Sequence, residues 1–200
     1  SDKAKKLVVE RYQYWTKKVT TNFDEEIVKD VFSDYIPILD ILTDKFACIA
    51  ANPPYMGRGN MNDGLKQYLE EKYPNSKSDL YTVFIEVCKN KIKKNGRIGL
   101  INPPSWMFNI SYTDLRKGLV EETRIESFLN FGRGIFGADF GTVCYIIKHE
   151  KPNLNRPAIF RSLFRGKSLV DSIQQKEEWF LKTDFNTYPV NQLNFLKISS

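Results

Sequence analysis

The chain has 200 residues, of which 42% are hydrophobic and 27% charged, and its formal net charge is +6. This composition is that of a globular domain with its own core, and the charge favours an anionic partner such as nucleic acid without requiring one. No apolar run approaches the roughly 18 residues that cross a bilayer, and no apolar signal core follows the first residues, so we expect a cytoplasmic protein without a membrane partner.

The N-terminal part of the chain is predicted to be helical. Apolar residues recur at three- and four-residue intervals through residues 1–35, and Asn22 and Asp24 provide a start for a second helix. A linker beginning near Tyr35-Ile36-Pro37 should lead into a short strand at 46–50. We expect residues 1–39 to be a helical arm or the end of a preceding module. Because the chain has neither an initiator Met nor a natural-looking end, we expect a piece of a larger protein.

The middle of the chain alternates strands and helices, which indicates an α/β fold. The clearest helix is predicted at 79–93, with Ser78 or Asp79 as its cap and Asn95-Gly96 as its end. The other elements expected are helices at 65–73 and 112–122 and strands at 97–101, 125–131, 142–148 and 157–163. The strand–helix–strand unit predicts parallel strands with a right-handed crossover. Residues 40–150 would form one core, and residues 151–200 would start a following region.

Two of the predicted strands end in nearly the same way. Asn-Pro-Pro-Tyr at 52–55 follows the first strand, and Asn-Pro-Pro-Ser-Trp at 102–106 follows the strand at 97–101. The carboxyl ends of parallel strands meet at one edge of the sheet, where doubly wound folds bind ligands. The two prolines make each turn rigid and hold the preceding Asn in place.

The first loop carries what methylation of a planar amine requires. In an amine such as N6 of adenine the lone pair is delocalised into the ring, so the nitrogen is a poor nucleophile. The side-chain oxygen of Asn52 and the carbonyl of Pro53 can accept its two hydrogens, and Tyr55 can stack on the base. The second loop has Ser105 in the position of Tyr55, so we predict that it is structural or faces the substrate.

Taken in order, these motifs resemble the catalytic core of N6-adenine DNA methyltransferases of the gamma arrangement, over about residues 40–148. The resemblance is greatest to the BREX phage-defence methyltransferases of the PglX type, with type II restriction–modification enzymes as neighbours. The segments that carry it are 52–57, 77–86, 95–99, 105–107 and 134–137. It implies a Rossmann-like sheet of an S-adenosylmethionine-dependent methyltransferase, partial in this chain and preceded by the helical arm. Residues 40–150 would be the C-terminal part of the catalytic core, and residues 151–200 would start the region that leads toward target recognition.

The resemblance also implies an activity, that of a site-specific adenine DNA methyltransferase in restriction–modification or phage defence. Double-stranded DNA would be its substrate, and other subunits of a defence system would be further partners. Asn52, Pro53 and Tyr55 would hold the flipped adenine, with Phe136 as a second aromatic side chain against the base.

The resemblance further assigns contacts with the cofactor. Pro54 and Phe84 would contact the adenine of S-adenosylmethionine. Phe84 lies on the apolar face of its predicted helix, so a place in the core is the alternative for it.

The cofactor loop departs from the family's pattern. The family places a Gly-rich loop before Asn-Pro-Pro-Tyr, yet residues 1–45 contain no glycine. Either this loop lies outside the chain or the motif order is permuted. The permuted candidate, Gly-x-Gly-x-x-Gly at 132–137, leads into a predicted strand instead of the helix that such a motif opens. We therefore expect a truncated core that binds the cofactor poorly on its own, with or without residual activity.

Basic residues would supply the contacts with DNA phosphates. Arg161, Arg165 and Lys167 form a cluster suited to phosphates. The alternative is an ordinary solvated loop.

Metal chemistry and nucleophilic catalysis by Ser or Cys are not expected. Cys48, Cys88 and Cys144 are far apart and lack metal-ligand spacing, and each is predicted to be a small core residue. His149 is the single histidine, and no nucleophile motif accompanies it.

Two other functions stay open on these residues. Protein glutamine-N5 methyltransferases also use Asn-Pro-Pro-Tyr, on an amide nitrogen. The loop that carries Phe136 and the basic balance favour adenine over glutamine. The other alternative is a catalytically silent module that docks on DNA or on partner subunits.

Overall fold

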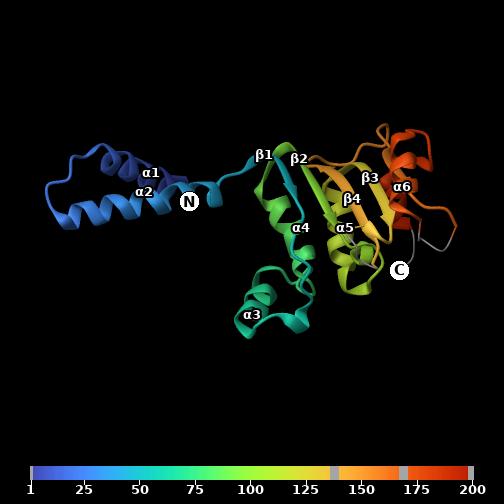
Figure 1. The fold of residues 1–200 in the computed structure, drawn as a ribbon, viewed down its shortest axis with the longest axis horizontal. Helices are drawn as coiled ribbons and strands as arrows, with labels where there is room; N and C mark the ends of the chain where they lie inside the picture. Colours follow the sequence, from blue (N-terminus) through green and yellow to red (C-terminus); the bar gives the residue numbers. More distant parts are fainter. Residues whose placement is uncertain (1, 136–139, 167–170, 198–200) are drawn as a thin grey trace. The chain divides into compact units, whose positions relative to one another are not determined.

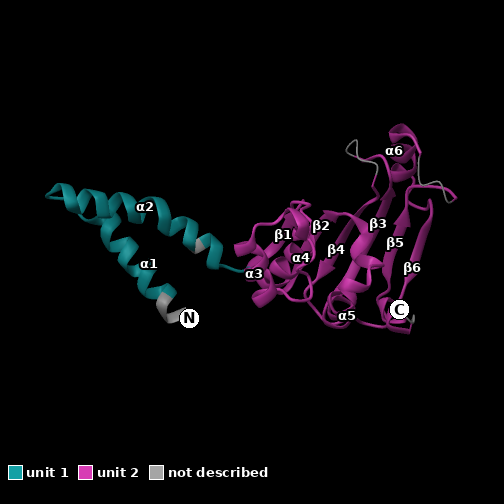
Figure 2. Ribbon diagram, turned by 90° about the horizontal axis from the view of Figure 1, so that it is seen from below, with its two compact units in different colours: residues 1–45 teal, residues 46–200 magenta. Residues whose placement is uncertain are grey.

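The computed structural model describes residues 2–135, 140–166 and 171–197, and the chain divides into two compact units, residues 1–45 and 46–200 (Figures 1 and 2). The first unit is a pair of helices, α1 (Asp2–Lys17) and α2 (Phe23–Thr43). Trp15 stacks on Phe32 with ring centroids 6.4 Å apart, which joins the two helices. The helical prediction for this part of the chain is confirmed.

Helix α2 is longer than predicted, because it continues through Pro37. The expected linker near Tyr35 is therefore wrong. Proline lacks an N–H and its ring crowds the preceding turn, so it weakens a helix without always ending it. Apolar residues at helical spacing continue beyond Pro37, at Ile38, Leu39, Ile41 and Leu42.

The second unit is built on one six-stranded mixed sheet. In spatial order its strands are β1 (Phe46–Ala51), β2 (Ile92–Asn102), β4 (Thr142–Lys148), β3 (Arg124–Gly132), β5 (Ala158–Ser162) and β6 (Thr187–Val190). Strands β1 and β2 are parallel, as are β3 and β5, and the other neighbours are antiparallel. The predicted parallel strand–helix–strand unit is confirmed, and the antiparallel β4 in the middle was not predicted.

The residues predicted to end the central helix lie instead within β2. Helix α4 (Leu80–Lys91) ends at Lys91 and the strand begins at the next residue. Asn95 adopts a left-handed backbone (φ 63°), and the pairing with β1 shifts at this point. A Cβ on Gly96 would lie 2.8 Å from the carbonyl oxygen of Ala47. The Asn95-Gly96 pair therefore forms a bulge that only glycine fits beside β1.

Helices α4 and α5 (Thr113–Glu122) enclose the main core against the sheet (Figure 1). The core side chains alternate along each strand, so that Val143, Tyr145 and Ile147 of β4 are buried while Ile146 is 38% exposed. The opposite face of the sheet is thus partly open to solvent. The remaining helices are α3 (Asp63–Lys72) and α6 (Ile173–Leu181), with short 3-10 turns η1 (Arg58–Asn60), η2 (Pro104–Met107), η3 (Ile110–Tyr112) and η5 (Gln192–Lys197).

The sheet continues past residue 150, since β5 and β6 pair with it. The assignment of 151–200 as the start of a region for target recognition stays a prediction. Among the described residues, no helix combines the length and the apolar character that a membrane crossing needs.

Candidate active site

The two Asn-Pro-Pro loops leave the same edge of the sheet. Strands β1 and β2 are parallel, and Ala51, the last residue of β1, pairs with Leu100 near the end of β2. Asn52 follows β1 directly, and Asn102 is the final residue of β2. The sequence prediction that both loops meet at this edge is confirmed.

The first loop presents its Asn to solvent. Asn52 is exposed, and its Oδ1 accepts a 2.9 Å hydrogen bond from the hydroxyl of Tyr55. The Tyr55 side chain is 40% exposed, and partial burial raises its pKa, so the hydroxyl remains a proton donor at neutral pH. Pro53 is buried and Pro54 exposed. The loop therefore brings an oriented amide oxygen and an accessible aromatic ring together.

In the second loop the corresponding Asn is buried instead of exposed. Asn102 is fully buried; its Nδ2 donates to the Tyr145 hydroxyl at 2.9 Å, and its Oδ1 accepts from Trp106 Nε1 at 3.2 Å. Both ends of its amide are thus satisfied inside the core. Asn102 is structural, while Ser105 in the same loop is exposed.

Two further aromatic rings meet Tyr55, and neither was singled out as a site residue. The ring of Tyr81 lies edge-on to Tyr55 with centroids 6.0 Å apart, and the ring of Phe140 does so at 5.9 Å. Phe140 lies four residues after the predicted Phe136, in the same glycine-containing segment. This position in the sequence could have indicated that Phe140 belongs to the site. Phe136 itself lies outside the described residues.

Asp79 ties the first loop to the start of α4. It is the N-cap of that helix, and its Oδ1 accepts from the backbone N–H groups of Met56 (3.0 Å) and Tyr81 (3.2 Å). Leu80 N–H donates in turn to the Met56 carbonyl at 3.0 Å. The predicted cap is confirmed, and it also fixes the chain just after Tyr55.

The residues predicted to contact the cofactor lie on different elements. Pro54 is in the first loop, and Phe84 is on α4, half-buried between the buried Val83 and Ile85. After β3 the next strand, β4, begins at Thr142, and none of the described residues between the two strands lies in an α-helix.

The basic cluster is partly engaged within the fold. Arg161 on β5 donates to the carbonyls at the end of α6, at 3.0 Å to Trp179, 3.2 Å to Phe180 and 2.7 Å to Lys182. Arg165 is exposed, with its guanidinium 5.4 Å from the centre of the Trp179 ring. Lys167 lies outside the described residues. The role of all three in binding phosphate stays a prediction.

The cysteines differ in burial. Cys88 is buried and Cys144 half-buried, but Cys48 is exposed on β1, so its prediction as a core residue is wrong. Strand β1 is at the edge of the sheet, and its first three residues are exposed. Within the described ranges, no group of three or more His, Cys, Asp or Glu side chains is arranged to hold a metal ion.

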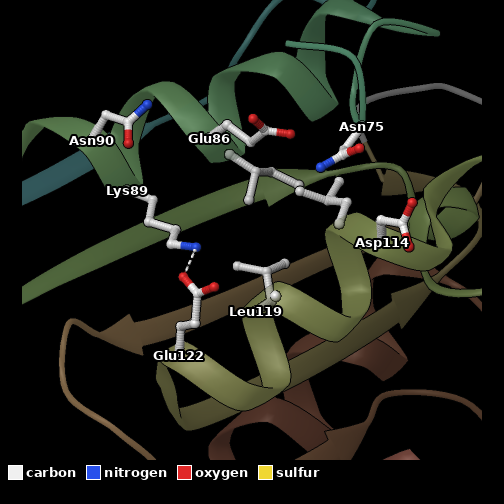
Figure 3. A pocket seen from close by; sticks show the side chains of 10 residues that line it. Asn75, Glu86, Lys89, Asn90, Asp114, Leu119 and Glu122 are labelled. Carbon is white, nitrogen blue, oxygen red and sulfur yellow. Dashed lines mark hydrogen bonds and ion pairs between the residues drawn. The ribbon is translucent and has the colours of Figure 1, made fainter.

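A hollow of about 170 Å³ lies between α4 and α5, away from the two loops. Figure 3 shows Glu86 and Asn75 beside it and the ion pair between Lys89 and Glu122 across it. None of the predicted site residues that the structure describes lines this hollow.

Comparison with known proteins identifies close relatives by sequence. The model of the Eco57I restriction-modification methylase family matches residues 2–136. The adenine-specific methyltransferase BrxX of Escherichia coli O9:H4 (strain HS) is 33% identical over 140 residues, 66% of this chain and 12% of that protein. The adenine-specific methyltransferase PglX of Lacticaseibacillus casei (strain Zhang) is 30% identical over 166 residues, 78% of this chain and 13% of that protein. The chain thus spans about an eighth of the length of these relatives.

A solved structure supports the fold. The methyltransferase subunit of a type I restriction-modification system from Streptococcus thermophilus matches with a TM-score of 0.54 and 18% identity, over 78% of this chain and 36% of that one. At this identity the likeness concerns the fold alone. The predicted α/β fold class is confirmed.

Proposed function

Because the chain belongs to the Eco57I restriction-modification methylase family, we propose that the protein carrying it methylates the N6 amine of adenine in double-stranded DNA. The methyl group would come from S-adenosylmethionine, and the adenine would be flipped out of the helix. The observation that carries this proposal is the exposed Asn52 amide, held beside the accessible ring of Tyr55 at the end of a parallel strand.

The chemistry follows from the atoms in the first loop. Asn52 Oδ1 and the Pro53 carbonyl would accept the two N6 hydrogens and draw the nitrogen toward a tetrahedral, nucleophilic state. A carbonyl oxygen has two lone pairs, so Oδ1 can keep its bond from Tyr55 while it accepts from the amine. Fixed dipoles of this kind cost no reorganisation during the reaction, and no strong general base is needed.

The base would be held by stacking. Flipping a nucleotide costs a few kcal/mol, and one aromatic contact returns roughly 1–3 kcal/mol. Tyr55 is the stacking residue in this proposal, with Phe136 as a second aromatic. Contacts from Arg161, Arg165 and Lys167 to phosphates would supply the rest.

The cofactor would be held only in part by this chain. Pro54 and Phe84 would contact its adenine, and the cofactor would supply the methyl group that the N6 nitrogen attacks. The absence of glycine from residues 1–45 leaves no Gly-rich loop there for the methionine end. We propose that such a loop comes from elsewhere in the complete protein, and that no metal takes part.

The biological setting would be restriction–modification, as the description of the family suggests, or phage defence, as the resemblance of the motifs to BREX methyltransferases implies. The protein would act in the cytoplasm. Other subunits of a defence system would be partners in addition to DNA.

The test is transfer of labelled methyl groups to unmethylated DNA by the complete gene product. We expect label on N6-methyladenine and a loss of roughly 100-fold or more in Asn52→Ala. Asn90→Ala is the matched control, because Asn90 is also exposed but lies at the end of α4. Label on glutamine in protein would replace the proposal with the N5-methyltransferase alternative. DNA binding with no transfer, unchanged by Asn52→Ala, would indicate a docking module.

A further inference from the structure

A buried tyrosine hydroxyl connects the two Asn-Pro-Pro loops. Tyr81 is only 2% exposed, and its hydroxyl lies 2.7 Å from Oγ of Ser105, where either atom can donate. Tyr81 is in the first turn of α4, and Ser105 is in η2 of the second loop. The bond thus joins two segments that are 24 residues apart.

Tyr81 is connected to the first loop through hydrogen bonds to Asp79. Its backbone N–H and that of Met56 share the Asp79 carboxylate oxygen, so the start of α4 and the chain after Tyr55 are fixed to one another. The Tyr81 ring lies edge-on against Tyr55 at 6.0 Å. A displacement of Tyr81 would therefore move the surface on which Tyr55 rests.

The second loop is also in contact with Tyr55. The Tyr55 hydroxyl lies 3.4 Å from the carbonyl oxygen of Ile101, in addition to its shorter bond with Asn52. Ile101 immediately precedes the second loop. A shift of the second loop would therefore displace the Tyr55 hydroxyl, which orients the Asn52 amide.

Loss of the hydrogen bond to Ser105 would be costly for the buried Tyr81 hydroxyl. Burial raises the pKa of this phenol, so the group stays protonated throughout the physiological range. A buried hydroxyl without a hydrogen bond is costly, whereas phenylalanine would fill the same space without that requirement. Ser105 is exposed, so its hydroxyl could otherwise be solvated.

We propose that Tyr81 and Ser105 are positioning residues for methyl transfer. Their hydrogen bond holds the second loop against the first, so that Tyr55 and the Asn52 amide keep the geometry that a flipped adenine requires. This inference rests on the proposed function. It assigns a role to Ser105 that the sequence comparison of the two loops left open.

The experiment is a double-mutant cycle in the complete gene product. The variants are Tyr81→Phe, Ser105→Ala and both together, with Ser105→Thr as the conservative variant that keeps a hydroxyl. The readout is the single-turnover rate of methyl transfer at saturating cofactor, on a duplex carrying the site that the wild type methylates. The dissociation constants for DNA and cofactor and the unfolding temperature are measured alongside.

We expect each single substitution to lower the single-turnover rate about three- to tenfold, the range that corresponds to one neutral hydrogen bond. The double variant should be no slower than the slower single one, because both remove the same bond. Ser105→Thr should restore most of the rate. Tyr188→Phe, which removes a tyrosine hydroxyl on β6 at the far edge of the sheet, should leave the rate unchanged.

Three outcomes would overturn the inference: a wild-type rate in Tyr81→Phe, multiplicative losses in the double variant, or an equal loss in Tyr188→Phe. If Tyr81→Phe unfolds, the exposed Ser105→Ala tests the same bond from its other end. A wild-type protein that transfers no methyl group to DNA would instead refute the proposed function. The inference would then fall with it.

Discussion

The hydroxyl of Tyr55 donates a 2.9 Å hydrogen bond to the side-chain oxygen of Asn52, three residues earlier in the same rigid loop. The amide is therefore oriented before any substrate is present. Preorganised groups of this kind lower a barrier because they need not be turned into place during the reaction. The second Asn-Pro-Pro loop shows that the tripeptide alone does not create such a site, since its Asn102 lies in the core.

Asn102 should matter for stability far more than Asn52 does. We expect Asn102→Ala to lower the free energy of unfolding by roughly 2–4 kcal/mol, because the Tyr145 hydroxyl and the Trp106 indole N–H lose their partner inside the core. Asn52→Ala, at an exposed position, should change it by no more than about 0.5 kcal/mol. Denaturant unfolding of both variants measures the difference, and similar costs at the two positions would contradict this account.

The Asp79 carboxylate should contribute both to helix α4 and to the loop after Tyr55. We expect Asp79→Ala to cost about 1–2 kcal/mol in unfolding free energy and to slow methyl transfer, since the Met56 N–H is released as well. Asn62 caps α3 in a similar way, through the Leu65 N–H at 2.8 Å. Asn62→Ala is therefore the control: it should destabilise the protein by about 1 kcal/mol and leave the single-turnover rate unchanged. A matching loss of rate in both variants would show that the effect is general destabilisation.

Glu150 should make stability depend on pH in the acid range. Hydrogen bonds from Lys148 and Arg124 lower the pKa of Glu150 to about 2 in the folded protein. The unfolded value is about 4.3. The stabilisation is thus complete above the unfolded pKa and is lost as the pH falls toward 2.

We therefore expect the unfolding temperature to fall between about pH 5 and pH 2, and to fall less in Glu150→Gln. Thermal unfolding across this range is the measurement. Glu121→Gln, an exposed change on α5, should keep the wild-type pH profile. A profile of Glu150→Gln that parallels the wild type would assign the acid sensitivity to other carboxylates.

Substitutions of Arg161 and Arg165 should differ in their effect on stability, because Arg161 also bonds carbonyl groups within the fold. Arg161 bonds three carbonyls at the end of α6, so Arg161→Gln should lower the unfolding temperature. Arg165 is exposed, so Arg165→Gln should leave folding intact. If Arg165 meets a phosphate, its loss should weaken DNA binding and reduce the slope of log affinity against log salt by about 0.9. An unchanged slope would remove Arg165 from the interface.

Local properties of this protein, such as a helix, a strand and a short motif, could be predicted from the sequence alone. The helical pattern of residues 79–93 and the β-branched run at 142–148 depend on local periodicity. The strand appears where predicted, and so does the helix, except that it ends at Lys91. The proposed reaction class also rests on a short motif, because Asn-Pro-Pro-Tyr places its acceptors and its ring within four consecutive residues. Local chemistry of this kind needs no knowledge of distant contacts.

Only the tertiary structure decided the remainder. It set the order of the strands, with β4 antiparallel between β2 and β3, because pairing depends on partners far away in the chain. It also made Asn102 structural and Asn52 accessible, although the two tripeptides are the same. The reason is physical. Tyr145 reaches Asn102 from β4, and together with Trp106 of the second loop it satisfies the Asn102 amide inside the core. Among the described residues, the Asn52 amide bonds only to Tyr55 of its own loop, and the Asn52 side chain is exposed.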